Sequence, residues 1–181
     1  MKRADQQRRR LMLAALASSM ASVTGPAHTA GRELRFASLG QALDELDSMA
    51  EAAARDTAAT WSWAETLEHC AQSIEYSIVG YPQTKSPLFQ RSLGAIAFRV
   101  FAMRGYMSHN LREPIPGAPS YRASTSTRTA VVRLRAAIRG FQTCEDALFP
   151  HFAYGVLSKV EYEQAHLMHL AEHFAEFVAK P

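Results

Sequence analysis

The sequence is poor in cysteine and lacks several well-known catalytic motifs. Its 181 residues include only Cys70 and Cys144, and they contain no CxxC pair. Two cysteines admit one disulfide in an oxidising compartment, or both are simply buried thiols. The chain also has no GxSxG nucleophile elbow, no phosphate-binding loop and no GxGxxG fingerprint. The familiar serine-hydrolase and nucleotide-binding motifs therefore do not account for this chain.

The expected folded domain also lacks an excess of positive charge. Residues 1–30 hold five basic residues and one acidic residue, a net charge of +4, which leaves −1 of the chain's net +3 for the remainder. Binding to nucleic acid requires Lys and Arg clustered on the folded body. The four arginines between positions 128 and 139 have the spacing of a solvated helix face. We therefore expect no nucleic-acid partner.

A long apolar run is absent as well. The stretch Leu11–Val23, which follows Arg8-Arg9-Arg10, is too short and too rich in Ser and Thr to indicate a stable membrane span. A basic start, a short apolar segment and small residues near Ala27–Ala30 are typical of an export signal, and the paired arginines resemble a twin-arginine signal. We predict a signal at 1–30, a folded domain at 31–181 and a periplasmic location. A Sec signal and an uncleaved anchor are the alternatives.

The remainder of the chain shows helical periodicity and no convincing alternating strand. Ser and Thr caps, capping boxes, and Gly or Pro stops delimit the segments. The expected helices run from Ser38 to about Arg55, from Thr60 or Ser62 to Val79, from Ser86 to about Arg104, from 124–127 onward, and from Ser158 to about Ala179. These segments predict an all-α fold, a four-helix bundle with long inter-helix connections.

Two of these predictions concern packing in detail. The helix that begins at 124–127 has an apolar stripe expected to face inward, made of Ala130, Val131, Leu134, Ala137, Ile138 and Phe141. The connection 105–124 holds three prolines in six residues and cannot be helical. Its apolar residues, Tyr106, Met107, Leu111 and Ile115, favour packing onto the body over disorder. A connection of this length is usually functional or disordered.

Histidines provide the main functional pattern. His169 and His173 lie at i and i+4, which places both rings on one face of a helix. One more imidazole from a packed helix, such as His69, would complete a three-nitrogen metal site with an open position. His166 lies two turns from His173, so both should not bind one ion, and we assign His166 a supporting or substrate-facing role.

Other polar residues are candidates around such a site. Glu65, Gln72 and Tyr76 share a helical stripe with His69. Glu65, Tyr76 or Glu172 is a candidate proton carrier, and Gln72 is a candidate to orient a ligand. Two further sets lie in the connections: His151 and Tyr154 as candidates for the mouth of the site, and His109 as a substrate or lid residue. Ordinary packing or solvation explains each of them equally well.

Two segments carry a family resemblance. The stretch Trp63–His69 and the stretch Tyr162-Glu-Gln-Ala-His-Leu-Met-His169-Leu-Ala-Glu-His173, with the spacing between them, resemble the DinB-like superfamily of metal-binding four-helix bundles. His69–Tyr76 and Pro150–Gly155 resemble a branch known only as a domain of unknown function. The resemblance implies that His69, His169 and His173 bind a divalent ion, and that two copies could form a homodimer.

The function expected from these observations is coarse. Imidazole ligands suit zinc, nickel, iron or copper. A bound metal could activate water for hydrolysis of, or transfer on, a small molecule. Some members of the superfamily are thiol-dependent transferases, but an exported protein would lack the cytoplasmic thiol cofactors that they use. The alternative is a non-enzymatic periplasmic bundle that binds a ligand or has a structural role.

Overall fold

The computed structural model describes residues 32–49, 53–55, 61–121 and 125–179. The predicted export signal at 1–30 lies outside these residues. The elements in chain order are α2 (Leu39–Met49), β1 (Ala53–Arg55), α3 (Trp63–Val79), α4 (Pro87–Phe89), the π-helical turn η1 (Gln90–Gly94), α5 (Ala95–Arg104), α6 (Thr127–Thr143), α7 (Lys159–Phe174) and β2 (Phe177–Ala179). The expected all-α class is confirmed.

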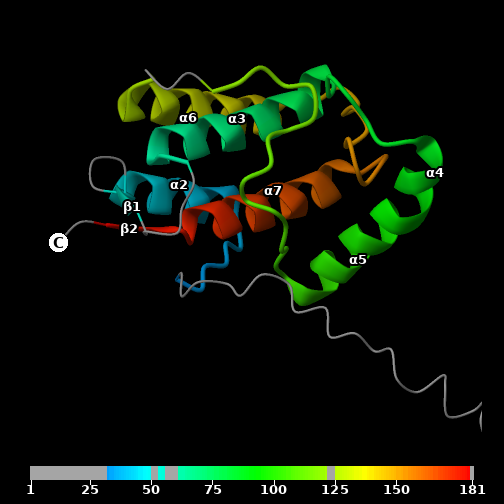
Figure 1. Cartoon of the computed structure of the whole chain (residues 1–181), viewed down its shortest axis with the longest axis horizontal. Helices are drawn as coiled ribbons and strands as arrows, with labels where there is room; N and C mark the ends of the chain where they lie inside the picture. Colours follow the sequence, from blue (N-terminus) through cyan, green and yellow to red (C-terminus); the bar gives the residue numbers. More distant parts are fainter. Residues whose placement is uncertain (1–31, 50–52, 56–60, 122–124, 180–181) are drawn as a thin grey trace, which may run out of the picture.

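Four helices share the core. Helix α3 lies along α6 and also packs against α7, while α2 packs against α7 and α6 (Figure 1). Helix α5 contacts α7 on its other side. The largest fully buried side chains come from these helices and from β2, and they include Leu46, Leu67, Leu134, Ile138, Phe141, Tyr162, Phe174 and Phe177. Among the described residues, no helix is both long and apolar enough to cross a bilayer.

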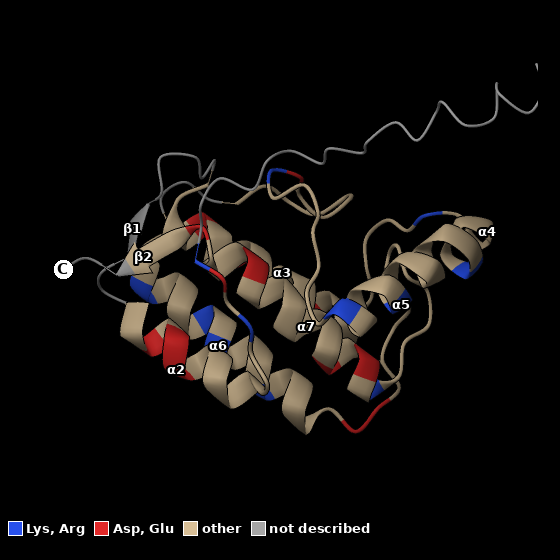
Figure 2. Ribbon diagram, turned by 90° about the horizontal axis from the view of Figure 1, so that it is seen from below, with Lys and Arg blue, Asp and Glu red and all other residues tan. Residues whose placement is uncertain are grey.

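The outside of these helices carries charges of both signs. The two signs are separated by helix: α2 and α3 carry acidic residues without Lys or Arg, whereas α5 and α6 carry arginines without Asp or Glu (Figure 2). At the seam between α3 and α6, Arg133 bonds to Glu68 and to Glu75, with Nε 3.0 Å from Glu75 Oε1. Arg133, one of the arginines between positions 128 and 139, therefore connects α6 to α3.

Helix starts are where the sequence predicts them. Ser62 caps α3 in a capping box with Glu65, and Ser158 caps α7 in a second one with Glu161. The Ser126 side chain caps α6. In each case a hydroxyl accepts a backbone N–H that the first turn would otherwise leave unpaired. The six residues expected to face inward on α6 are all buried.

Two predicted helix ends are wrong. Helix α2 ends at Met49 rather than about Arg55, and α7 ends at Phe174 rather than about Ala179. The chain beyond each end forms a short antiparallel pair, with Ala54 of β1 opposite Val178 of β2. Strand pairing satisfies the backbone that further helix would have satisfied. It also places Phe177 in the core, 4.9 Å from the ring of Trp63.

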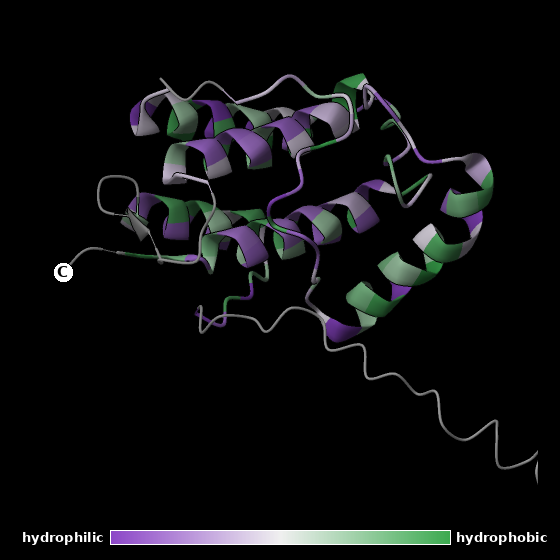
Figure 3. Cartoon of the chain, in the orientation of Figure 1, coloured by the Kyte–Doolittle hydropathy of each residue, from purple (hydrophilic) through white to green (hydrophobic). Residues whose placement is uncertain are grey.

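The helix expected from Ser86 to Arg104 forms, but it contains the π-helical turn η1. Gly94 lies in that turn, and an added Cβ there would sit 2.0 Å from the carbonyl oxygen of Ala153. Only glycine permits this approach of the 151–155 turn. The same helix shows apolar residues to the outside along α4–α5 (Figure 3), namely Leu88, Leu93, Ile96 and Met103.

The connection after α5 crosses the face between α3 and α7 (Figure 1). Met107 and Ile115 are buried in it, as expected, whereas Tyr106 is exposed. Gln72 Nε2 donates to the carbonyl of Pro119 at 3.3 Å, which fixes the end of the connection on α3. The described part of this segment therefore packs on the helices.

Both cysteines are free. Cys70 is buried on α3, and Cys144 is partly exposed at the end of α6. Burial raises the pKa of the Cys70 thiol, which keeps it protonated and unreactive. The disulfide that the sequence allows does not form in this structure.

Candidate metal centre

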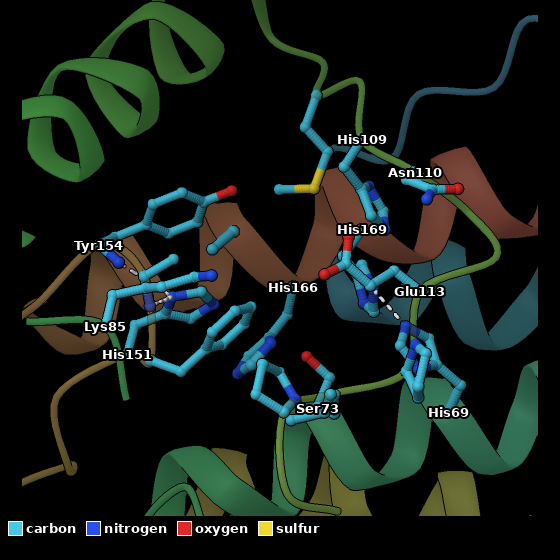
Figure 4. Close-up of a pocket in the computed structure, with 17 residues that line it drawn as sticks. His69, Ser73, Lys85, His109, Asn110, Glu113, His151, Tyr154, His166 and His169 are labelled. Atoms are coloured by element: carbon cyan, nitrogen blue, oxygen red, sulfur yellow. Dashed lines mark hydrogen bonds between the residues drawn. The ribbon is translucent and has the colours of Figure 1, made fainter. Parts of the chain in front are cut away.

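Four histidine side chains converge between α3, α7 and the connection that crosses them. His69 comes from α3, His169 and His173 from α7, and His109 from the connection. One ring nitrogen from each lies within 4.8 Å of the others. Nε2 of His69 and Nε2 of His169 are 3.0 Å apart and face one another (Figure 4). The structure thus brings together the three histidines proposed from the sequence and adds a fourth.

The helical spacing explains the pair on α7. His169 and His173 are one turn apart, and their ring centroids are 4.6 Å apart. The ring of His69 is 4.9 Å from that of His169 and 4.6 Å from that of His173. Packing of α3 on α7 therefore closes a triangle of imidazoles from two helices.

The fourth histidine is held by a carboxylate on α7. Glu172 Oε1 accepts from the backbone N–H of His109 at 2.9 Å, and Oε2 lies 2.6 Å from His109 Nδ1. Glu172 is almost fully buried. A carboxylate at Nδ1 favours the tautomer with its proton there, which leaves Nε2 as a free lone pair toward the cluster.

His69 has a comparable outer partner. Its Nδ1 lies 2.6 Å from the hydroxyl of Tyr121. A hydroxyl can accept from Nδ1–H, and this arrangement also leaves Nε2 with a lone pair. Both ends of the crossing connection, His109 and Tyr121, thus meet the cluster.

His173 provides the clearest sign that something further belongs here. The residue is fully buried, and neither ring nitrogen has a hydrogen-bond partner. A buried polar group without a partner costs about 1–3 kcal/mol. The three neighbouring imidazoles do not remove that cost, because none of them forms a hydrogen bond with His173.

Burial keeps the rings of His69, His169 and His173 neutral. It lowers the pKa of His69 to about 3, with a further contribution from His109. Burial and the neighbouring histidines also hold the pKa values of His169 and His173 well below the usual range. Neutral imidazoles present lone pairs, the form in which histidine binds metals.

An indole shields the cluster. The ring of Trp61 stacks on that of His173 at 6.0 Å with 14° between their planes, and it lies 4.8 Å from the ring of His69. The same indole meets the edge of Tyr121 at 5.2 Å. Aromatic packing on the ligand rings limits their rotation and excludes water on that side.

The opposite side of the cluster opens into a cavity of about 260 Å³. His69, His109 and His169 line one end, and Met107, Ile115 and Phe152 give the middle an apolar wall. Glu113 lines it too, beside His169 in Figure 4. The site therefore has room for a small molecule next to the imidazoles.

Other sequence candidates lie at varied distances from the cluster. Glu65 accepts from the backbone and hydroxyl of Ser62 as the α3 cap. The ring of Tyr76 packs 5.7 Å from Tyr81, away from the cavity lining. Gln72 is buried, with its Oε1 unpaired. Of the three proton-carrier candidates, Glu172 is the one that contacts a member of the cluster.

His151, Tyr154 and His166 line the same cavity away from the four-histidine cluster (Figure 4). Ser77 Oγ donates to the carbonyl of Ile74, so it accepts from His166 Nε2–H at 3.3 Å. Burial lowers the pKa of His166 to about 3. His166 thus neighbours the cluster without joining it.

The sequence interpretation did not anticipate four contacts. The sequence favours His109 as a substrate or lid residue rather than a fourth nitrogen, and it indicates no role in the site for Glu113, Trp61 or Tyr121. His109, Glu113 and Tyr121 lie in a proline-rich connection without helical periodicity, so spacing could not place them. The length of the connection and its apolar residues were the only available indications.

Fold and site together define a helical protein with a four-histidine cluster that could hold a metal ion. The chain belongs to the family described as "Protein of unknown function (DUF1569)", whose model matches residues 28–180. The prediction of a family of unknown function is thereby confirmed, and membership of the DinB-like superfamily stays a prediction. No curated protein and no solved structure matches the chain.

Proposed function

We propose that this protein binds one divalent metal ion through His69, His109, His169 and His173. The observation that carries the proposal is the convergence of four ring nitrogens around a point where His173, fully buried, has no hydrogen-bond partner. A cation would satisfy the inward-facing lone pairs together. No hydrogen bond within the described part of the protein involves either ring nitrogen of His173.

The donor set suits a transition metal. Two nitrogens each about 2.1 Å from one ion lie about 3.0 Å apart at a right angle and about 3.4 Å apart at a tetrahedral angle. The 3.0 Å between Nε2 of His69 and Nε2 of His169 falls at the start of this range. Neutral imidazoles favour zinc, nickel or iron over calcium or magnesium.

The cavity beside the cluster supports metal-assisted hydrolysis or transfer on a small molecule. A bound metal of this kind supplies a Lewis acid and lowers the pKa of bound water. Glu113 lines the cavity wall beside His169, where its carboxylate is placed to accept a proton (Figure 4). Glu172 holds His109 rather than facing substrate.

Three finer statements belong to this proposal. Membership of the DinB-like superfamily is supported by the α3 and α7 histidines that the resemblance singled out. Export to the periplasm rests on the arginine-led segment at 1–30. Assembly as a homodimer rests on the resemblance alone.

Elemental analysis of protein purified from its own host tests the metal. We expect close to one equivalent of a transition metal per chain, and recovery of that stoichiometry when zinc is returned to chelator-treated protein. Metal binding should raise the melting temperature, because an ion that binds only the folded state stabilises it. Protein that arrives without metal and takes up none would contradict the proposal.

A further inference from the structure

The end of the cavity away from the four-histidine cluster has its own polar group of residues. Lys85, His151 and Tyr154 line it, and Figure 4 shows them together on the side opposite His69 and His169. All three side chains carry a hydrogen-bond donor. None of them belongs to the proposed metal ligands.

His151 is locked as a neutral donor. Its Nδ1 accepts from the backbone N–H groups of Ala153 at 3.1 Å and Tyr154 at 3.2 Å. The neutral ring therefore carries its proton on Nε2, which has no hydrogen-bond partner among the described residues. Burial, with a further contribution from His166, lowers the pKa of His151 to about 3. More than nine-tenths of the residue is buried, with 8% exposed.

The turn that carries His151 is rigid. His151 and Gly155 exchange backbone hydrogen bonds of 2.8 and 3.1 Å. Gln90 Nε2 donates to the carbonyl of His151 at 3.3 Å and to that of Phe152 at 3.2 Å. The imidazole is thus held in place before any ligand arrives, which lowers the entropic cost of binding.

Tyr154 adds a second neutral donor. Its ring stacks on that of His151 at 4.2 Å with 8° between the planes. Burial, and secondarily Glu172, raise the pKa of the phenol to about 12, so the hydroxyl keeps its proton. No hydrogen-bond partner of that hydroxyl occurs in the described part of the chain, and in Figure 4 it points along the cavity.

Lys85 supplies the positive charge. Its backbone N–H donates to the carbonyl of Phe152 at 2.8 Å, which ties the lysine to the residue after His151. Its side chain is exposed at the cavity mouth. No acidic residue lines this end; Glu113 lies on the side of His169 (Figure 4).

We infer that Lys85, His151 and Tyr154 form a subsite for the carboxylate of a small ligand that occupies the cavity. One ammonium group and two neutral donors match a single negative charge, whereas a phosphate dianion would leave one charge uncompensated. The inference rests on the proposed function only in assigning the ligand's reacting end to the metal. The substrate class is then a small carboxylic acid with a hydrolysable or transferable group at its other end.

The size of the cavity limits that class. A volume of about 260 Å³ corresponds to roughly nine water volumes at about 30 Å³ each, so ligands of about ten non-hydrogen atoms fit. The apolar middle, lined by Met107, Ile115 and Phe152, suits a short hydrocarbon chain between the two polar ends.

Binding of pentanoate to chelator-treated protein tests the subsite without metal. The matched probes are pentanamide, which has the same shape without charge, and propyl phosphate. The variants are Lys85→Met, Lys85→Arg and, as a remote control, the exposed Arg91→Met. Calorimetry or competition with a fluorescent carboxylate gives each dissociation constant.

We expect wild-type protein to bind pentanoate at least about tenfold more tightly than pentanamide, the scale of one charge-assisted hydrogen bond. Lys85→Met should remove the preference, Lys85→Arg should restore it, and Arg91→Met should leave it unchanged. Equal binding of acid and amide, a preference that survives Lys85→Met, or tighter binding of propyl phosphate would overturn the inference.

A parallel zinc titration separates this inference from the proposed function. Protein that prefers pentanoate but takes up no zinc would retain the carboxylate subsite and lose the metal centre. Protein that takes up zinc without any preference for pentanoate would retain the metal centre and lose the subsite.

Discussion

The cavity has buried histidines at both ends, and their surroundings differ. At one end, His69 and His169 face each other through Nε2, and His173 has no partner at either nitrogen. At the other end, His151 accepts from two backbone N–H groups, and His166 lies 3.3 Å from the hydroxyl of Ser77. At the second end each ring has at least one hydrogen-bond partner within the protein, whereas at the first end His173 has none.

This contrast shows which property marks a metal site. Burial lowers the pKa of His151 and His166 as it lowers that of His69. Burial and a lowered pKa therefore occur at both ends of the cavity and do not distinguish one end from the other. The distinguishing feature is a set of ring nitrogens that face one another across the cluster. In His69 and His109 the other ring nitrogen, Nδ1, already has an oxygen partner.

The largest expected effect comes from exchanging one histidine at each end. His169→Asn should weaken zinc binding by more than about a hundredfold, because it removes a ligand that faces the ion directly. His166→Asn, one turn earlier on α7, should change zinc affinity by less than about threefold. Titration against a chelator of known affinity measures both, and circular dichroism checks that each variant is folded. Equal losses in the two variants would abolish the distinction between the two ends.

The next effect concerns how His109 is held. Glu172→Gln should reduce zinc affinity by about tenfold to a hundredfold, since it replaces one of the two oxygens that contact the backbone N–H and Nδ1 of His109 with an NH2 group, which cannot accept. Glu163→Gln, also on α7 but without a contact to the cluster, is the matched control and should bind zinc as wild type does. An affinity unchanged in both variants would remove His109 from the metal centre.

The turn at the far end is open to a test of stability alone. Gly94→Ala should lower the free energy of unfolding by about 1–3 kcal/mol, because its Cβ would meet the carbonyl of Ala153. Gly140→Ala on α6 meets only Ile78 at 3.7 Å, and it should raise stability by about 0.5–1 kcal/mol. Urea unfolding of metal-free protein measures the pair. A destabilising effect of Gly140→Ala equal to that of Gly94→Ala would show that the close approach at Gly94 is unimportant.

Much of the fold could be predicted because it depends on neighbouring residues. Ser62 with Glu65 and Ser158 with Glu161 are capping boxes that each span four residues, and they start α3 and α7 as expected. The apolar stripe of α6 repeats with the helical period, so periodicity alone identified its buried face. The pair His169 and His173 is local in the same sense.

The remaining features depend on residues far apart in the sequence. Helix α2 stops at Met49 because the following chain pairs with β2, more than a hundred residues later. No local pattern shows that pairing, and the alanine-rich sequence there favours helix. His109 reaches the cluster only because Glu172 holds it, a contact between residues 63 positions apart. Helical spacing could indicate the pair on α7, and the family resemblance added His69, but neither indicated the fourth ligand.

The smallest expected effect is a pH dependence that belongs to the far end. His151 has a pKa of about 3 in the folded protein, against about 6.5 when unfolded. On acidification the unfolded chain takes up the proton first, so this residue's contribution to stability is intact above pH of about 6.5 and is lost progressively toward pH of about 3. His151→Asn keeps an acceptor for the backbone N–H groups and removes the titration.

Between pH 7.5 and pH 5.5, metal-free wild type should therefore lose on the order of 1 kcal/mol more unfolding free energy than His151→Asn does. Between pH 8.5 and pH 7.5 the two proteins should change alike. Adding zinc should leave the difference between them unaltered, because His151 lies at the end of the cavity that binds no metal. A difference that disappears with zinc would mean that His151 communicates with the cluster, and the two ends would have to be treated as one site.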